Sequence, residues 1–285
     1  MTANHTGPDT TGANDAGLAP SVMEARAVSI GYGEVEVVDG LSVEIEAGVI
    51  TALCGPNGSG KSTLLKAMAR LIPFQDGAVL LDGKAITEYP TMEIARRMSI
   101  LPQGPRAPHG LTVRELVEQG RFPHVGALRM LRAQDRKAVD RALTLTGMLG
   151  FADRPLDALS GGERQRAWIA LTLAQETKLL LLDEPTTFLD IGHQLEVLEL
   201  ARKLNQENGI TVVIVIHDLN HAARYAERMI VLDRGSIAAD GHPTHVLTDD
   251  VLERVFGVRA SVLTDPQTGK PVCLPYERIE AETDG

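Results

Sequence analysis

Short, unbroken runs of mostly apolar residues recur along this chain, unlike the alternating pattern of a sheet with one solvated face. The clearest runs are residues 49–54, 179–182 and 211–216, and residues 98–101 form a weaker fourth. Runs of this length are typical of parallel strands that helices cover on both faces. We therefore expect buried, parallel strands at these positions.

Segments with helical spacing of apolar residues lie between the predicted strands. The clearest is 194–207, whose apolar positions are Leu195, Val197, Leu198, Leu200, Ala201 and Leu204. Strands that alternate with such segments are typical of an α/β fold.

Each predicted strand leads to residues with an obvious chemical use. In chain order these are a glycine-rich loop, Gln103, the pair Asp183 and Glu184, and His217. Ligands of open parallel sheets sit beyond the carboxyl ends of the strands. The sequence thus predicts one site at one edge of the sheet.

The glycine-rich loop fits G-x-x-x-x-G-K-[ST], the pattern of a phosphate-binding loop. Its residues are Gly55, Pro56, Asn57, Gly58, Ser59, Gly60, Lys61 and Ser62, followed by Thr63. The backbone N–H groups of such a loop and the positive end of the next helix form an anion site. Lys61 supplies charge for the outer phosphates, and the Ser62 hydroxyl suits Mg²⁺. The loop predicts a bound nucleoside triphosphate, with an ordinary glycine-rich turn as the alternative.

Two acids and a histidine have distinct uses beside such a loop. Asp183 can hold Mg²⁺ directly or through water, and Glu184 can polarise a water that attacks the γ-phosphate. His217 can reach the γ-phosphate as a donor. The alternatives are a solvated acidic pair at a strand end and a partly buried structural histidine.

A second anion site is indicated at residues 159–166. Ser160 and Glu163 form the S-x-x-E capping box of a helix start. Gly161 and Gly162 lie in its first turn, although glycine costs up to ~1 kcal/mol relative to alanine inside a helix. Such a cost is understandable where a ligand approaches the backbone. Two copies arranged head to tail would combine each loop with the partner's helix start. Taken alone, the segment is an ordinary helix cap.

Composition narrows the classes of function. The 285 residues suffice for one or two domains with a well-buried core. The formal net charge of −10 argues against the broad basic face that nucleic acid requires. No apolar run approaches the roughly 20 residues of a membrane-spanning helix, so a membrane role must come through a partner. We expect residues 1–22 to be a disordered tail.

The motifs, in this order, closely resemble those of ATP-binding cassette (ABC) ATPases. The matched parts are the phosphate loop, the Q-loop, the signature motif, the Mg²⁺-carboxylate strand, the D-loop and the switch histidine: 55–62, Gln103, 159–166, 179–184, 187–190 and His217. Tyr32 stands where the family usually has an aromatic ring that stacks on adenine, with strand packing as the alternative.

The resemblance implies an α/β fold with a RecA-like P-loop core, an antiparallel β subdomain and an inserted α-helical subdomain. The ATPase domain would cover residues 23–257, with the helical subdomain at about 104–158. Residues 258–285 would form a short C-terminal extension.

The resemblance also implies a homodimer that sandwiches two MgATP, each between one phosphate loop and the partner's signature serine. Ser160, Gly161 and Gly162 would contact the γ-phosphate held by the other copy, and Asp190 would also lie at the nucleotide. Glu184 would act as general base and His217 would stabilise the γ-phosphate. Gln103 would bind at the metal and couple the site to the helical subdomain.

Several segments are similar to the importer ATPases for ferric siderophores, cobalamin and haem. They are 111–117, 120–124, 184–194, 255–257 and the turn at 265–270. A ferric-siderophore importer is our first expectation, with cobalamin or haem as alternatives. Such a subunit would serve two membrane permease subunits and an extracytoplasmic substrate-binding protein at the cytoplasmic face of the membrane. The rival class is a soluble ABC ATPase that acts on ribosomes or DNA, although each motif occurs only once here.

Overall fold

The computed structural model describes residues 21–33, 35–126 and 130–279. Of the predicted tail, residues 1–20 lie outside the described part, and strand β1 begins at Ser21. Residues 280–285 of the predicted extension also lie outside it.

A central sheet of six strands forms the middle of the molecule, in the order β10-β9-β3-β8-β7-β6. The strands are β3 (Ile50–Cys54), β6 (Met98–Leu101), β7 (Leu179–Asp183), β8 (Thr211–Val215), β9 (Arg228–Asp233) and β10 (Ser236–Gly241). All neighbours pair in parallel except β10, which pairs antiparallel with β9 at the edge. The predicted parallel strands and the α/β class are confirmed.

Alternate residues of the buried strands point into two different hydrophobic cores, which explains their unbroken apolar pattern. In β8, Val212 and Ile214 pack with helices α7 (Ile191–Asn208) and α8 (Leu219–Tyr225). Val213 and Val215 face the opposite core with helix α1 (Lys61–Met68). A strand with helices on both faces needs apolar side chains at every position.

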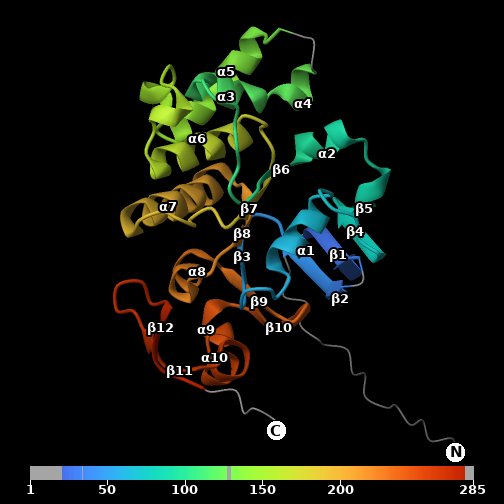
Figure 1. The fold of residues 1–285 in the computed structure, drawn as a ribbon, viewed down its shortest axis with the longest axis vertical. Helices are drawn as coiled ribbons and strands as arrows, with labels where there is room; N and C mark the ends of the chain where they lie inside the picture. The colour runs from blue at the N-terminus through green and yellow to red at the C-terminus, as the bar shows by residue number, and fades with distance from the viewer. Residues whose placement is uncertain (1–20, 34, 127–129, 280–285) are drawn as a thin grey trace, which may run out of the picture.

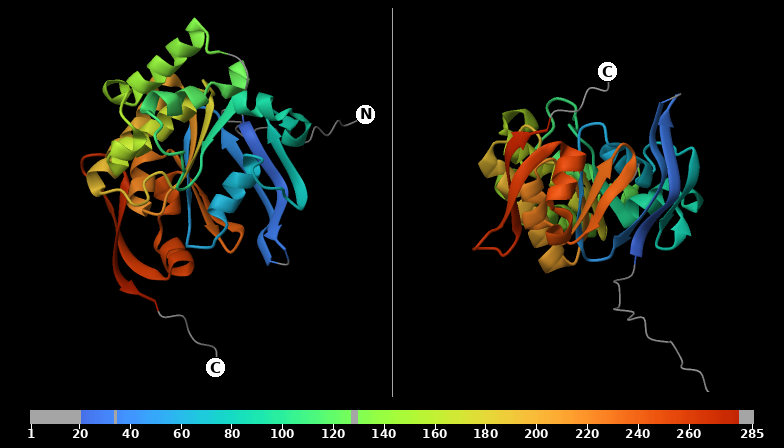
Figure 2. Two further views of the ribbon diagram at one scale, coloured as in Figure 1. Left: turned by 45° about the horizontal axis from the view of Figure 1, so that its top comes forward. Right: turned by 90° about the horizontal axis from the view of Figure 1, so that it is seen from below.

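An antiparallel sheet covers the α1 side of the central sheet, in the order β2-β1-β4-β5. Its strands are β1 (Ser21–Tyr32), β2 (Val35–Glu46), β4 (Asp76–Leu81) and β5 (Lys84–Ala85). A 3₁₀ turn (Ile86–Glu88) and helix α2 (Thr91–Arg97) connect it to β6. Both views in Figure 2 place this sheet and the C-terminal hairpin on opposite sides of the central sheet.

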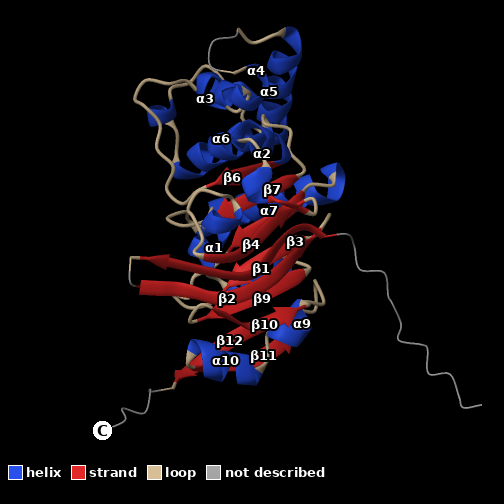
Figure 3. Ribbon diagram, turned by 90° about the vertical axis from the view of Figure 1, so that its right-hand side faces the viewer, coloured by secondary structure: helices blue, strands red, loops and turns tan. Residues whose placement is uncertain are grey.

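A layer of helices lies at one end of the molecule, beyond the edge strand β6 (Figures 1 and 3). It contains α3 (Val113–Gln119), α4 (Phe122–Val125), α5 (Ala133–Leu145), two 3₁₀ turns (Leu149–Phe151 and Leu156–Ala158) and α6 (Gly161–Leu173). These helices share their own hydrophobic core, which includes Val117, Leu143 and Ala170.

The segment after β10 lies at the end of the molecule opposite the helical layer (Figure 1). After β10 come α9 (Pro243–Val246), α10 (Asp249–Phe256) and a hairpin of β11 (Val258–Thr264) and β12 (Pro271–Arg278). The Asn220 side chain fastens the hairpin to α8, because its amide donates to the Cys273 carbonyl and accepts from the Cys273 N–H. Across the residues that the structure describes, every helix is too short or too polar to cross a bilayer.

A buried ion pair holds the helical layer together. The Arg121 guanidinium donates to Oδ1 of Asp135 at 3.0 Å, and their side chains are only 4% and 0% exposed. Burial raises the pKa of Asp135, but hydrogen bonds from the Arg132 N–H and from Arg121 more than offset this and hold the pKa below its usual value. Arg121 also donates to the Ala174 carbonyl and to Glu176, where the chain leaves α6 for β7.

We expect Arg121→Ala to destabilise the fold by about 3–5 kcal/mol, because Asp135 then stays buried without its cation. Urea denaturation measures this free energy of unfolding. The matched control is Arg114→Ala. Arg114 of α3 forms a more exposed ion pair with Asp140, which lies on α5 as Asp135 does. This control variant should cost about 1 kcal/mol at most. Equal losses in both variants would contradict this role for Arg121.

Candidate nucleotide site

The loop between β3 and α1 needs glycine at particular positions. Gly55 has φ +139°, and a Cβ there would lie 2.1 Å from the Leu232 carbonyl oxygen of β9. Gly60 has φ +99° and begins α1, and within the described residues no side chain caps that helix start. The first-turn N–H groups of a helix have no intrahelical acceptor and favour an anion. The backbone thus has the glycine-dependent turn and the uncapped helix start that a phosphate cradle needs.

Lys61 lies folded back into this loop. Its Nζ donates to the carbonyl oxygens of Gly55 at 2.9 Å and Pro56 at 2.8 Å, and the residue is only 4% exposed. Burial lowers the pKa of Lys61, and the negative charge of Glu184 partly opposes that shift. A buried ammonium with an acidic neighbour is well placed to hold phosphate oxygens.

Ser62 and Asp183 meet at the carboxyl end of β7. The Ser62 hydroxyl donates to Oδ1 of Asp183 at 2.6 Å. The second carboxylate oxygen, Oδ2, is buried and makes no hydrogen bond within the described residues, although Lys66 Nζ lies 3.3 Å away as an ionic contact. Mg²⁺ is usually held by one or two carboxylates plus phosphate oxygens and water. The hydroxyl and the carboxylate oxygen that makes no hydrogen bond fit this ion. In the described part of the chain, no group of three or more His, Cys, Asp or Glu side chains is placed to hold a metal ion.

Glu184 is the meeting point of the predicted catalytic residues. His217 Nε2 lies 2.7 Å from its Oε1, and the Gln103 amide donates to its Oε2 at 2.6 Å. The Thr187 hydroxyl also donates to Oε2, at 3.1 Å. Glu184 itself has φ +51°, a conformation that costs roughly 1–3 kcal/mol and is found mainly at functional sites. The ends of β6, β7 and β8 therefore bring Gln103, Glu184 and His217 together as expected.

The signature segment begins α6, as predicted. The Ser160 hydroxyl accepts from the Glu163 N–H at 3.3 Å, and the Glu163 carboxylate accepts from the Ser160 N–H at 2.8 Å. Within the described residues, these hydrogen bonds of Ser160 reach Glu163 alone and not the phosphate loop. Ser160 and Gly161 are exposed at this helix start, whereas Gly162 is buried.

The remaining predicted residues lie in three places. Thr63 is in the first turn of α1. Tyr32 ends β1 and is 54% exposed, which leaves its ring open to a ligand. Asp190 caps α7 by accepting from the His193 N–H, and that contact and the His193 side chain hold the pKa of Asp190 below its usual value. Asp190 is thus engaged within its own chain.

Two contacts at the site were not predicted. Lys66 faces Asp183 because it lies one helical turn after Ser62, a spacing that the sequence displays. His193 packs against Gly162 of the signature segment. No local sequence pattern predicts this contact, because its two residues lie on different helices.

Residues 38–187 match the ABC transporter family. The chain is 52% identical to the iron(3+)-hydroxamate import ATP-binding protein FhuC of Bacillus subtilis, over 92% of this chain and 97% of FhuC. The chain belongs to the ABC transporter family. The hemin import ATP-binding protein HmuV of Rhodococcus jostii is 41% identical, over 89% of this chain and 86% of HmuV.

Among solved structures, the bacterial ABC transporter cassette MJ0796, determined as a dimer, resembles this ABC ATPase with a TM-score of 0.69 and 31% identity. The match covers 78% of this chain and 98% of MJ0796. The family membership confirms the resemblance that the ordered motifs gave, and with it the ATPase class.

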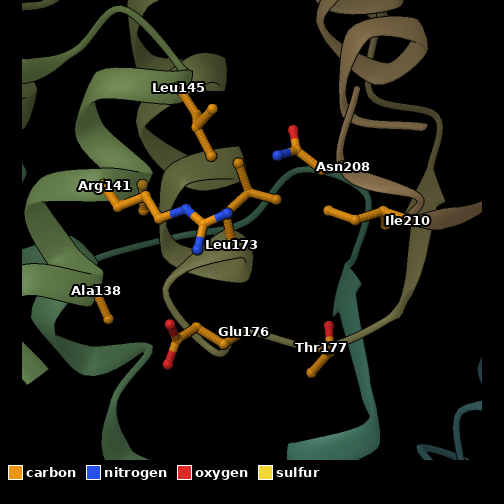
Figure 4. A pocket seen from close by; sticks show the side chains of 9 residues that line it. Ala138, Arg141, Leu145, Leu173, Glu176, Thr177, Asn208 and Ile210 are labelled. Carbon is orange, nitrogen blue, oxygen red and sulfur yellow. The ribbon is translucent and has the colours of Figure 1, made fainter. Parts of the chain in front are cut away.

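A separate cavity of about 160 Å³ lies where the helical layer meets the core (Figure 4). Its lining comes from α5, α6, the segment after α6 and the end of α7, and includes Arg141, Leu173, Glu176 and Asn208. None of the predicted nucleotide-site residues lines it. It is therefore distinct from the phosphate loop of this ABC ATPase.

We expect Lys61→Ala to weaken ATP binding by at least ~10-fold, because a hydrogen bond to a charged group contributes about 1.5–3 kcal/mol and about 1.4 kcal/mol is tenfold in affinity. Isothermal titration calorimetry measures the affinity. Lys84→Ala, which removes an exposed lysine of β5, serves as control. Native affinity in the Lys61 variant would remove this residue from the phosphate site.

Proposed function

We propose that this chain is the ATP-hydrolysing subunit of an ABC importer for ferric siderophores. The observation that carries the proposal is the arrangement of Glu184 between Gln103 and His217, one residue after the buried Asp183 that pairs with Ser62. Two copies would serve two permease subunits at the cytoplasmic face of a membrane. An extracytoplasmic binding protein would deliver the cargo.

In this mechanism the loop from Gly55 to Gly60 and the Lys61 ammonium bind the phosphates of ATP. Ser62 and Asp183 would hold Mg²⁺, which would neutralise charge on the phosphate oxygens. Glu184 accepts a proton from the attacking water as the water oxygen bonds to the γ-phosphorus. The bond from the γ-phosphorus to the bridging oxygen breaks, and ADP leaves with that electron pair.

His217 and Gln103 orient Glu184 for this step. The ring and the amide each contact one carboxylate oxygen, so the side chain has a defined direction although it starts from a strained backbone. Positioned groups of this kind, rather than covalent intermediates, dominate catalysis of phosphoryl transfer.

The second half of each site comes from the other copy. Ser160 and Gly161 are exposed at the start of α6, and the hydrogen bonds of Ser160 reach Glu163 and not its own phosphate loop. A two-fold arrangement gives both copies the same contact and completes two sites at once. The dimeric MJ0796 cassette supports this arrangement.

The cargo is assigned by similarity, because an ATPase subunit does not touch it. FhuC is more similar to this chain than HmuV is, which favours a siderophore over haem. Cobalamin remains the other alternative. An acidic chain with a single cassette also disfavours the rival class that acts on ribosomes or DNA.

Glu184→Gln should keep ATP affinity and slow hydrolysis by at least ~10²-fold, the usual contribution of a general acid–base group. Release of phosphate measures the rate. With MgATP and without turnover, the variant should sediment as a dimer. Glu115→Gln is the matched control, since Gln also satisfies the capping box of α3 in which Glu115 takes part. Wild-type turnover in the Glu184 variant would exclude it as the base.

Cells that express this chain with its permease and binding protein should accumulate radiolabelled iron from ferric siderophores. The same cells with Glu184→Gln should not, because transport depends on ATP hydrolysis. Unlabelled haem and cobalamin, tested as competitors, should leave iron uptake unchanged. Uptake of haem or cobalamin instead of the siderophore would replace the cargo but keep the ATPase assignment.

A further inference from the structure

The signature glycine Gly162 lies directly on the imidazole ring of His193. A Cβ at position 162 would be 2.1 Å from Cδ2, 2.5 Å from Cγ and 2.9 Å from Nε2 of that ring. At Gly161 the nearest atom to a Cβ would be Cδ2 of Leu189, at an ordinary 3.4 Å. Within one subunit, then, position 162 needs glycine because of His193, whereas position 161 does not.

Asp190 holds the His193 ring in this place. One carboxylate oxygen accepts from the His193 N–H at 3.0 Å, and the other lies 2.8 Å from Nδ1 of the ring. Both oxygens of Asp190 thus act on one residue, and a rotation of the ring away from Gly162 would break the second contact. The D-loop, residues 187–190, is thereby joined to the start of α6.

Gly162 is in α6 and His193 is in α7. One turn further along, a second contact joins these helices, because Arg166 of α6 pairs with Glu196 of α7. Contacts at two successive levels fix how the first turn of α6 lies against α7. The His193 side chain is 33% exposed. Its ring contacts the D-loop carboxylate and lies against the signature glycine.

We propose that His193 is a positioning residue that couples the D-loop to the signature motif of the same subunit. Its ring, held by Asp190, sets the position of Ser160 and the first turn of α6, which reach the nucleotide of the partner copy. The inference rests on the proposed function, because it needs a composite ATP site. A displacement of about 1 Å at a catalytic contact can cost ~10²-fold in rate, so a small shift of this helix tip is sufficient.

A double-mutant cycle tests the coupling through kcat and KM for ATP. Gly162→Ala should lower kcat roughly 10- to 100-fold with KM nearly unchanged, because the new methyl group displaces the ring and the helix tip while the phosphate loop is intact. His193→Ala should also lower kcat. The double variant should regain activity relative to Gly162→Ala, since the methyl group then occupies space that the ring has left.

A second double variant, Gly162→Ala with His193→Asn, should show no rescue. Asparagine keeps a Cγ atom, and in His193 this atom lies 2.5 Å from a Cβ at position 162. His221→Ala is the matched control, because His221 has the same place after the capping Asp218 of α8. No glycine of the described chain has His221 among the nearest atoms to its Cβ position. That control should keep the native kcat.

Strict additivity in the double variant with His193→Ala would overturn the coupling, because Gly162 would then be required only for the approach of the partner's phosphate. Ser160→Ala separates this failure from failure of the proposed function. If Ser160→Ala lowers kcat while the cycle is additive, the composite site stands and the His193 proposal fails. If Ser160→Ala leaves kcat unchanged, the composite site itself fails.

Discussion

The site depends on one constraint at the end of the buried strand β7. The adjacent acids Asp183 and Glu184 must face different surroundings. Asp183 is the last residue of β7 and has a fully buried side chain against Ser62. Glu184 follows at once with φ +51°, which turns the chain away from the strand direction. The neighbours of β7 are β6 and β8, so Gln103 and His217 flank Glu184 from both sides. Their contacts offset the strain at Glu184, and the sheet order therefore places the metal side and the water side of the site one residue apart.

Local patterns made much of this arrangement predictable from the sequence. The apolar runs predicted the parallel strands because nearly all of their residues are buried. The capping box of Ser160 and Glu163 was predictable because it occupies only one helical turn. The antiparallel sheet came from family resemblance instead, since register shifts in β1 disturb its alternation. The contact of His193 with Gly162 could not be predicted from the sequence, because it depends on how α6 and α7 pack against each other.

The junction between the helical layer and the central sheet differs from both in that an ion pair and a cavity lie there. Glu176 has φ +55° and pairs with Arg121, so the segment after α6 is held by a buried cation instead of by apolar packing. Beside it lies the cavity of Figure 4, with Arg141 from α5 facing Asn208 from the end of α7. The connecting segment therefore borders a cavity and also carries an ion pair to the helical layer.

The capping role of Ser160 does not compete with a role at the partner's phosphate. A serine hydroxyl has one donor and two acceptor positions. In α6 it accepts from the Glu163 N–H, and hydrogen bonds from the Ser160 N–H and from this hydroxyl to the Glu163 carboxylate lower the pKa of that acid. A rotation of the O–H alone would redirect it to a phosphate oxygen. The first-turn N–H groups of Gly161 and Gly162 likewise have no acceptor inside their helix. Glu163 satisfies the Ser160 N–H, so the turn is held in shape before any ligand arrives. The donors that would meet a γ-phosphate are therefore preorganised, and binding need not first order them.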